Sequence, residues 1–270
     1  MSGFAGSLPK AYQAFLVPLL FEPYAEDLAN RLSTRPLARV LEIAAGTGVV
    51  TRALASKLPE GVSIVATDRN QPMLDQAAAL GSARPVEWRS ADAMRLPFGE
   101  REFDAVVCQF GVMFFTDKPK AFAEARRVLD PSGVFAFNVW DRLELNELAD
   151  AVTASLAELF PDDPPRFLER LPHGYHDRAT IEKDLAAGGF PAPEILTLAI
   201  HSRAPSPRDA AIGFCHGTPL RDEIEARGET LERATDAAEE GIARRFGRGP
   251  VTARMQAHVV VVENGSGAAG

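Results

Sequence analysis

Cysteine is scarce in this sequence of 270 residues, which contains only Cys108 and Cys215. Cys108 lies inside an apolar run, and two isolated thiols make neither a disulfide framework nor a cysteine metal site. The sequence therefore predicts a protein of the reducing cytoplasm that holds no metal ion.

Long basic blocks are also absent, since no Lys/Arg run exceeds the pairs Arg126-Arg127 and Arg244-Arg245. The formal net charge is −8. Such a chain repels a phosphate backbone, so nucleic acid is not an expected partner. Arg126 and Arg127 are predicted to lie on a solvated helix face.

No apolar run reaches the roughly 20 residues that span a bilayer. The segment 10–21 is apolar, but Pro18 interrupts it, and Glu22 follows it in place of a small-residue cleavage site. We therefore expect this segment to belong to the mature fold, and we expect no membrane insertion.

Strand-like and helix-like segments alternate between residues 39 and 140. The predicted strands cover residues 39–43, 62–67, 86–89, 103–110 and 133–140. The predicted helices between them lie near 49–57, 71–80 and 118–129. This alternation is typical of an α/β fold with a doubly wound, mostly parallel sheet, which binds its ligands at the carboxyl ends of the strands.

The rest of the chain is predicted to form additions to this core. We expect a helical cap (1–34), a core (35–204), a helical lid insertion (205–249), a final strand (250–263) and a flexible tail (264–270). The lid is predicted from an apolar stripe amid dense charge, and the same stripe is a candidate homodimer interface. The stripe consists of Ile224, Leu231, Ala234, Ala238 and Ile242.

A ligand-binding turn is predicted where an apolar run carrying Glu42 meets Gly46 and Gly48. Glycines let the backbone turn tightly and expose its amides at a helix start, so a polar ligand can approach closely. Asp68 and Asp92 follow the second and third predicted strands. Because ribose hydroxyls and an exocyclic amine donate hydrogen bonds to carboxylates, an adenosine ligand fits these acids.

Two classes of adenosine ligand remain open on these residues. Asp68 lies twenty residues after Gly48, which is the spacing of a ribose contact in a dinucleotide site. Thr51, however, stands where a dinucleotide loop has its third glycine, and a pyrophosphate sits poorly beside Glu42. A ligand that carries an ammonium and a sulfonium agrees better with that acid.

Five segments together resemble the class I methyltransferases that use S-adenosylmethionine. They are VLEIAAGTG at 40–48, TDRNQPML at 67–74, SADA at 90–93, FDAVVCQFG at 103–111 and VLDPSG at 128–133. The likeness is closest to the branch of quinone-biosynthetic and natural-product methyltransferases. It implies a Rossmann-like sheet of seven strands, S-adenosyl-L-methionine as cofactor and S-adenosyl-L-homocysteine as product.

The resemblance also implies roles for individual residues. Asp68 holds the ribose, Asp92 accepts from the adenine amine, and Tyr12 closes over the methionine part. Ala44 replaces a glycine common in the family, and alanine is tolerated there if its φ is negative. The full set of implied cofactor contacts is Tyr12, Glu42, Ala44, Gly46, Gly48, Asp68, Arg69, Met73, Asp92, Ala93, Gln109 and Phe110.

The acceptor is predicted to be a small molecule that offers an O, N or C atom. The resemblance favours this because Gln109-Phe110-Gly111-Val112 stands where methyltransferases of amide or nucleobase nitrogens carry Asn/Asp-Pro-Pro-aromatic. Alignment of the reactants supplies most of the catalysis, and proximity can lower the barrier by roughly 7–11 kcal/mol. A general base is needed only when the acceptor arrives protonated.

His173 and His176 are the candidate bases, because histidine titrates near neutral pH. A structural role is the alternative for His176, since Asp177 beside it is a good N-cap for the next helix. The spacing of the two histidines also fits a metal site, but no neighbouring cysteine completes one.

Two other functions remain open from the sequence. One is a nicotinamide-dependent oxidoreductase, which would bind a nicotinamide dinucleotide and not S-adenosylhomocysteine. The other is a noncatalytic S-adenosylmethionine sensor, in which the ligand reshapes the lid without any methyl transfer.

Overall fold

The computed structural model describes residues 7–265 of the chain. Contacts divide it into two compact units. The helical unit comprises Met1–Glu22, Trp140–Gly174 and Leu198–Ala257, and the sheet unit comprises Pro23–Val139, Tyr175–Thr197 and His258–Gly270. Residues 1–6 of the predicted cap and 266–270 of the predicted tail lie outside the described residues.

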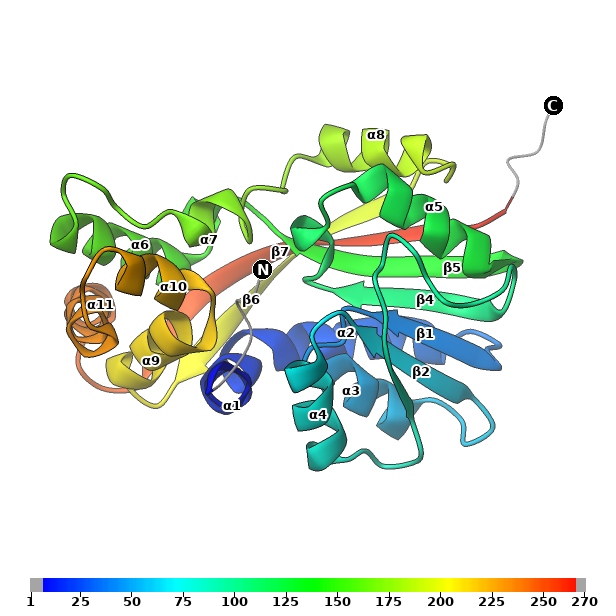
Figure 1. The fold of residues 1–270 in the computed structure, drawn as a ribbon, viewed down its shortest axis with the longest axis horizontal. Helices are drawn as coiled ribbons and strands as arrows, with labels where there is room; N and C mark the ends of the chain where they lie inside the picture. Colours follow the sequence, from blue (N-terminus) through cyan, green and yellow to red (C-terminus); the bar gives the residue numbers. More distant parts are fainter. Residues whose placement is uncertain (1–6, 266–270) are drawn as a thin grey trace. The chain divides into compact units, whose positions relative to one another are not determined.

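Seven strands form one sheet in the order β3-β2-β1-β4-β5-β7-β6 (Figure 1). They are β1 (Arg39–Ile43), β2 (Ser63–Asp68), β3 (Glu87–Ser90), β4 (Phe103–Gln109), β5 (Leu129–Trp140), β6 (Glu194–Ala204) and β7 (Val251–Glu263). The pairs β1–β2, β1–β4, β2–β3 and β4–β5 are all parallel. The predicted α/β fold with a mostly parallel sheet is confirmed.

Helices of the sheet unit follow its strands in the predicted alternation. They are α2 (Glu22–Ser33), α3 (Val49–Lys57), α4 (Gln71–Leu80), the short η2 (Val112–Phe114), α5 (Lys118–Val128) and α8 (Arg178–Ala187). Asn70, Asp117 and Asp177 cap α4, α5 and α8 by accepting a backbone N–H in the first turn. Helices α5 and α8 lie side by side next to β5 (Figure 1).

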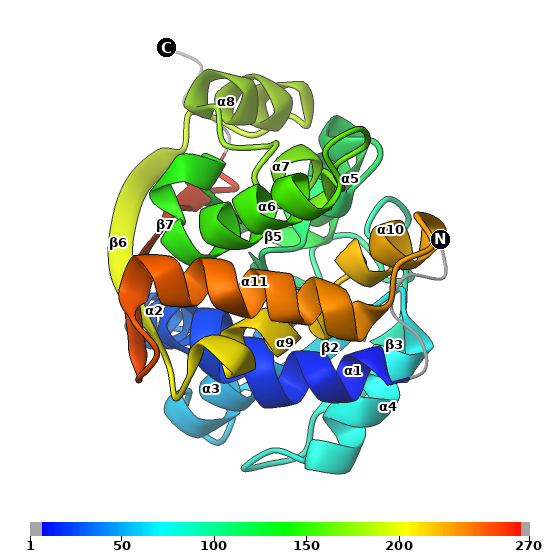
Figure 2. The ribbon, with the colours of Figure 1, turned by 90° about the vertical axis from the view of Figure 1, so that its left-hand side faces the viewer.

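The helical unit is built around α11, which packs on α6 and α9, while α9 packs on η1 (Figure 2). Its helices are α1 (Leu8–Ala11), the π-helical η1 (Tyr12–Phe21), η3 (Leu143–Leu145), α6 (Glu147–Leu159), α7 (Phe167–Arg170), α9 (Pro207–Gly217), α10 (Leu220–Ala226) and α11 (Leu231–Phe246). The predicted insertion 205–249 is thus helical. Four residues of its apolar stripe (Ile224, Ala234, Ala238 and Ile242) are buried within this unit, so the stripe is not an exposed face for a second copy.

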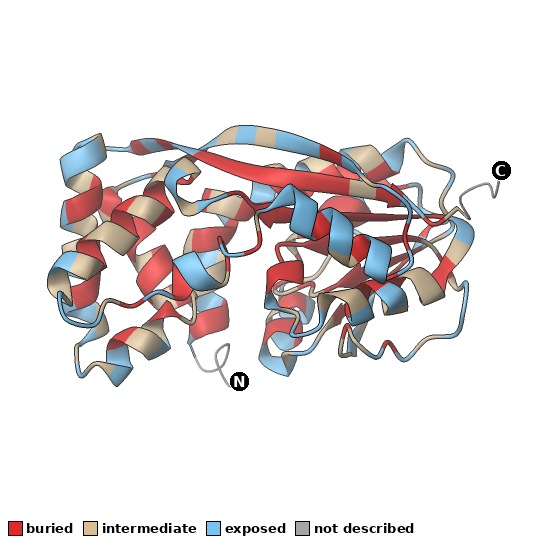
Figure 3. Ribbon diagram, turned by 90° about the horizontal axis from the view of Figure 1, so that it is seen from above, coloured by how far each residue is buried: buried red, intermediate tan, exposed pale blue. Residues whose placement is uncertain are grey.

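Burial in the sheet unit is greatest along the central strands, which are red in Figure 3, whereas the edge strand β3 has no buried residue. β1 and β4 are almost entirely buried. On the α5 side, the rings of Phe122, Phe135 and Phe137 form one cluster, with centroids 4.9–5.8 Å apart. This core holds the carboxyl ends of the strands in fixed register.

At two boundaries the structure departs clearly from the sequence predictions. β5 begins at Leu129, because the Asp130-Pro131-Ser132 segment stays within the strand in spite of its turn-like composition. Asn264, predicted to begin a flexible tail, is buried, and its Nδ2 donates to the carbonyls of Leu129 and Asp130.

No helix in the described part of the chain is long and apolar enough to cross a membrane.

Candidate functional site

The glycine loop between β1 and α3 makes the tight turn that the sequence predicts. Gly46 and Gly48 both have positive φ, 55° and 79°. A Cβ on Gly48 would lie 2.7 Å from the Trp88 ring, so only glycine fits there. The loop amide of Ala45 donates to the Thr67 carbonyl at 2.9 Å, which ties the loop to the end of β2.

The expected negative φ at Ala44 is wrong, since the structure gives +56°. An L-residue in this left-handed region is strained, because its Cβ crowds the neighbouring carbonyl. Gly111, in the segment between β4 and η2, leaves room for this alanine, because a Cβ on Gly111 would lie 2.6 Å from the Ala44 Cβ. Backbone strain of this kind concentrates at functional sites.

Glu42 lies beneath the loop and is only 1% exposed. Its carboxylate accepts a hydrogen bond from the Thr51 hydroxyl, and its carbonyl accepts one from the Thr67 hydroxyl at 2.8 Å. Burial raises the pKa of Glu42 to about 8. Thr51, which stands where a dinucleotide loop has glycine, therefore serves as a hydrogen-bond donor to Glu42. The sequence did not reveal this role. The predicted contact of Glu42 with a cationic ligand stays a prediction.

Asp68 ends β2 and joins that strand to the glycine loop. Its Oδ2 accepts the Gly46 N–H at 2.8 Å, and its Oδ1 accepts the Asn70 N–H at 2.7 Å. Burial raises the pKa of Asp68. Each carboxylate oxygen has a second lone pair, so the backbone bonds orient the group and leave it able to accept from ribose hydroxyls.

A cavity of about 300 Å³ lies at the carboxyl ends of β2 and β3. Its walls contain two predicted contact residues, Asp92 and Arg69; the full lining is Arg69, Ser90, Ala91, Asp92, Arg95, Leu96 and Pro97. Asp92 Oδ1 accepts the Met94 N–H at 2.9 Å, which fixes the carboxylate at the wall. Ala93 and Met73 are both buried, and their predicted contacts with the cofactor remain predictions.

The end of β4 is held by a residue that the sequence analysis missed. Asn138 of β5 is fully buried, and its Oδ1 accepts the Phe110 N–H at 3.0 Å. Its Nδ2 donates to Gln109 Oε1 at 3.4 Å. Phe110 has a φ of 48°, and Tyr24 packs edge-on against its ring, with the centroids 5.2 Å apart. The only sequence signal was one amide within an apolar strand.

The two candidate histidines lie in different settings. His173, in the helical unit, is 5% exposed, and its Nδ1 lies 2.8 Å from the Asp141 carbonyl oxygen. A carbonyl oxygen only accepts, so Nδ1 carries a proton, and Nε2 is the nitrogen that can exchange one. His176, in the sheet unit, precedes Asp177, whose carboxylate caps α8 by accepting the Thr180 N–H at 2.9 Å.

Side chains around His173 form a polar network within the helical unit. Asp141 Oδ2 accepts from Gln256 Nε2 at 2.7 Å, and Asn146 Nδ2 donates to the Asp141 carbonyl at 3.2 Å. The Trp140 ring lies 6.0 Å from the imidazole, centroid to centroid. Within residues 7–265, no group of three or more His, Cys, Asp or Glu side chains could hold a metal ion.

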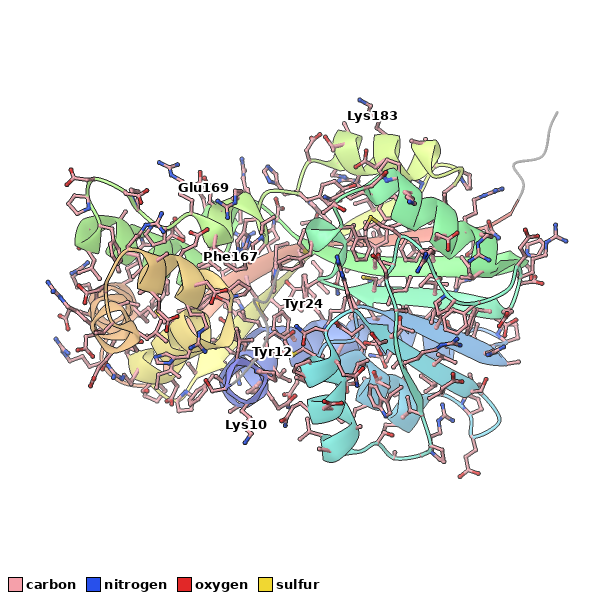
Figure 4. The ribbon with its side chains drawn as sticks, viewed as in Figure 1. Lys10, Tyr12, Tyr24, Phe167, Glu169 and Lys183 are labelled. Carbon is pink, nitrogen blue, oxygen red and sulfur yellow. The ribbon has the colours of Figure 1, made fainter. Side chains whose placement is uncertain are left out.

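Tyr12 extends from η1 in the helical unit, where Figure 4 labels it. It stacks on Phe21 with a centroid distance of 5.0 Å, and Phe21 in turn lies 6.2 Å from Trp140. An aromatic row thus leads from Tyr12 to the Trp140–His173 pair. The predicted contact of Tyr12 with a cofactor stays a prediction.

Comparison with known proteins agrees with this geometry. A family model described as a methyltransferase domain matches residues 41–137, which include the glycine loop, Asp68, Asp92 and the end of β4. The ubiquinone/menaquinone biosynthesis C-methyltransferase of Paraburkholderia phymatum is 30% identical over 206 residues, covering 72% of this chain and 79% of that protein. The demethylmenaquinone methyltransferase of Thermus thermophilus is 42% identical over 122 residues, covering 44% of this chain and 54% of that protein.

Solved structures show the same fold at low identity. Phosphoethanolamine N-methyltransferase 2 of Haemonchus contortus, in complex with S-adenosyl-L-methionine, aligns over 96% of this chain and 57% of that one, with a TM-score of 0.61 and 17% identity. YcgJ of Bacillus subtilis aligns over 91% of this chain and 100% of that one, with a TM-score of 0.59 and 17% identity. The sequence relatives and the conserved fold lead to one assignment. The chain belongs to the methyltransferase family and is a class I enzyme that uses S-adenosylmethionine as its methyl donor.

Proposed function

We propose that this enzyme transfers the methyl group to a small aromatic acceptor of the quinol or phenol type. Two of the similar proteins above are named for quinone biosynthesis, and one of them is named as a C-methyltransferase. The observation that carries the proposal is the aromatic row that ends at a buried histidine, formed by Tyr12, Phe21, Trp140 and His173. Flat rings pack well on such rows, and a neutral imidazole can take a hydroxyl proton.

The residues of the sheet unit fit S-adenosylmethionine. The site at Gly48 has no room for a side chain, the carboxylate of Asp68 is oriented by two backbone amides, and Asp92 lines a cavity. We infer that Asp68 binds the ribose hydroxyls and that Asp92 accepts a hydrogen bond from the adenine amine. When bound, the cofactor supplies a methyl group on a sulfonium, which is a good leaving group.

His173 is the proposed general base for an acceptor that arrives protonated. Its Nδ1–H is committed to the Asp141 carbonyl, so Nε2 is the atom that takes the proton. Asp141 is itself held by Gln256 and Asn146, so the ring orientation is fixed before the acceptor binds. His176 is assigned a structural place next to the N-cap of α8.

We further propose that the enzyme works in the cytoplasm. Its two cysteines are both free thiols and both buried, which agrees with a reducing compartment. The absence of a membrane-crossing helix from the described residues is compatible with this proposal.

Transfer of labelled methyl tests the proposed function directly. Purified protein is incubated with methyl-labelled S-adenosylmethionine and a panel of hydroquinones, phenols, amines and carboxylic acids, and the products are separated by mass. We expect the label on a quinol or phenol, with one S-adenosylhomocysteine formed per methyl transferred. Label on amines or carboxylic acids alone would contradict the proposed acceptor class.

A further inference from the structure

Leu96 lies in the wall of the 300 Å³ cavity, within the irregular segment that follows β3. Backbone groups in such a segment need hydrogen-bond partners, because no ladder or helix supplies them. Both backbone groups of Leu96 are bonded to side chains of α5. Its N–H donates to Glu124 Oε2 at 2.8 Å, and its carbonyl accepts from Arg127 Nη2 at 3.1 Å.

The two side chains that hold Leu96 also hold each other. Arg127 Nε lies 2.7 Å from Glu124 Oε1, and Arg127 Nη2 lies 2.8 Å from Glu124 Oε2. Arg127 Nη1 donates in addition to the Phe98 carbonyl at 2.8 Å. The expectation that Arg127 lies on a solvated helix face is therefore wrong. Its side chain is only 30% exposed, and its planar guanidinium binds one carboxylate and two carbonyls in a fork geometry that a lysine ammonium does not offer.

The position of Leu96 affects Asp92 through a short turn. Arg95, which precedes Leu96, donates its N–H to the Asp92 carbonyl at 2.9 Å. The Asp92 carboxylate accepts the Met94 N–H within the same turn. A shift of Leu96 therefore moves the turn that carries the Asp92 carboxylate.

We propose that Glu124 and Arg127 are positioning residues that shape this cavity and so set the preference of the enzyme for adenine over other bases. The proposal rests on the proposed role of Asp92 at the adenine amine. Neither side chain lines the cavity, so each acts through Leu96 and the Asp92 turn. An ion pair on one helix is thus assigned a part in base selection.

Calorimetric binding of two ligands tests the proposal. S-Adenosylhomocysteine carries the 6-amino group, and S-inosylhomocysteine carries a carbonyl in its place, so their affinity ratio reports on Asp92. We expect the wild-type protein to prefer the adenosyl ligand by about tenfold or more. In R127M and E124Q the preference should fall to about threefold or less, and R127K should recover only part of it, since lysine keeps the charge without the second carbonyl bond.

The variant R31M is a matched control. Arg31 and Asp27 form a helical ion pair on α2, with side-chain exposures of 30% and 24% against 30% and 20% for Arg127 and Glu124. We expect R31M to keep the wild-type ratio. If R127M does not fold, the isosteric E124Q provides the same measurement.

Three results would overturn the proposal, and they are distinguishable. An unchanged ratio in folded R127M and E124Q would show that the ion pair only supports the fold. Equal binding of the two ligands by the wild-type protein would remove the role of Asp92 as well. No binding of S-adenosylhomocysteine by the wild-type protein would contradict the proposed cofactor site itself.

Discussion

Buried polar side chains are arranged differently in the two units. In the sheet unit, Glu42 and Asp68 lie on adjacent parallel strands; Glu42 bonds to Thr51 in the first turn of α3, and Asp68 bonds to the backbone amides of Gly46 and Asn70. In the helical unit, Asp141 bonds to Gln256, a residue 115 positions away in the chain, and its carbonyl meets His173. Strand register brings the first pair together. The second group combines one backbone bond, from the Asp141 N–H to the Gln256 carbonyl at 3.1 Å, with side-chain hydrogen bonds that reach residues outside the sheet.

This difference suggests different functions for the two groups. Carboxylates fixed by backbone amides are suited to bind a ligand that always has the same hydroxyls and amine. A histidine with one nitrogen committed to a carbonyl is suited to exchange a proton at the other. Variants in the sheet unit should therefore change cofactor affinity, and variants around His173 should change turnover.

The largest expected effect is on turnover in H173Q. Loss of a general base lowers kcat by about 10²–10⁴-fold, while the Kd for S-adenosylhomocysteine should stay unchanged. Steady-state kinetics across pH should also show the loss of the rate increase that accompanies deprotonation of the base. H176Q is the control and should keep wild-type turnover; equal losses in both variants would contradict the assignment of the base to His173.

The next effect concerns pH and stability at Glu42. Its pKa of about 8 in the folded protein lies above the ordinary value of 4.5, so folding favours the protonated carboxyl. This contribution to the free energy of unfolding is full below pH 4.5 and is lost as the pH rises through 8. Since each pKa unit corresponds to about 1.4 kcal/mol, we expect a difference of several kcal/mol.

This effect is measured by urea unfolding of the wild-type protein and of E42Q. The pH is varied between 5 and 9, a range of about four units that includes the shifted pKa. Glutamine stays neutral and can still accept from Thr51. The stability of E42Q relative to the wild-type protein should therefore increase with pH. A difference that does not vary with pH would show that Glu42 ionises normally when buried.

A smaller effect is expected for cofactor affinity in D68A. Each lost hydrogen bond to a carboxylate costs about 1.5–3 kcal/mol. Because about 1.4 kcal/mol corresponds to a factor of ten, the loss of a single bond should raise the Kd for S-adenosylhomocysteine at least tenfold. The matched control is D104A, because Asp104 Oδ2 also accepts two backbone N–H groups, from Ala38 and Arg39, but at the amino end of the strands. Calorimetry should show weaker binding for D68A only. A similar loss in D104A would mean that any disturbance of the sheet weakens binding.

The smallest effect is expected at Ala44. A44G removes the strain of a left-handed alanine, and the free energy of unfolding should rise by up to about 1 kcal/mol. Ala45 is the control, since its φ is not positive and A45G should destabilise by about 0.5–1 kcal/mol. Thermal unfolding of the two variants gives the comparison. Destabilisation by A44G would indicate that the strain at Ala44 is small.

The sequence predictions were most successful for residues that directly follow a strand. The fold class and the convergence of the glycine loop with Asp68 could be predicted, because parallel strands bring their carboxyl ends to one edge. The family resemblance supplied the cofactor. It did not reveal the sign of φ at Ala44, which depends on the space left by Gly111 in the segment that follows β4.

The groups that hold the site could not be predicted in the same way. Asn138 reaches the end of β4 across 28 residues, and Arg127 reaches Leu96 across 31. Arg127 was predicted to be a surface residue because its own helix offers only Glu124 as a partner and gives no sign of the Leu96 and Phe98 carbonyls. Likewise, nothing in the spacing of Asp141, Asn146 and Gln256 indicates that they meet. Tertiary packing decides such contacts, and one sequence carries no local pattern for them.

The placement of the two tryptophans has an optical consequence. The chain has two tryptophans. Trp88 belongs to the sheet unit and Trp140 to the helical unit. The indole of Trp88 lies against Gly48 of the loop and is partly exposed, whereas Trp140 is buried beside His173. Replacing either one with phenylalanine leaves a single fluorophore. Emission from the remaining indole would then follow each unit separately, with Trp88 reporting the donor loop and Trp140 the surroundings of the histidine.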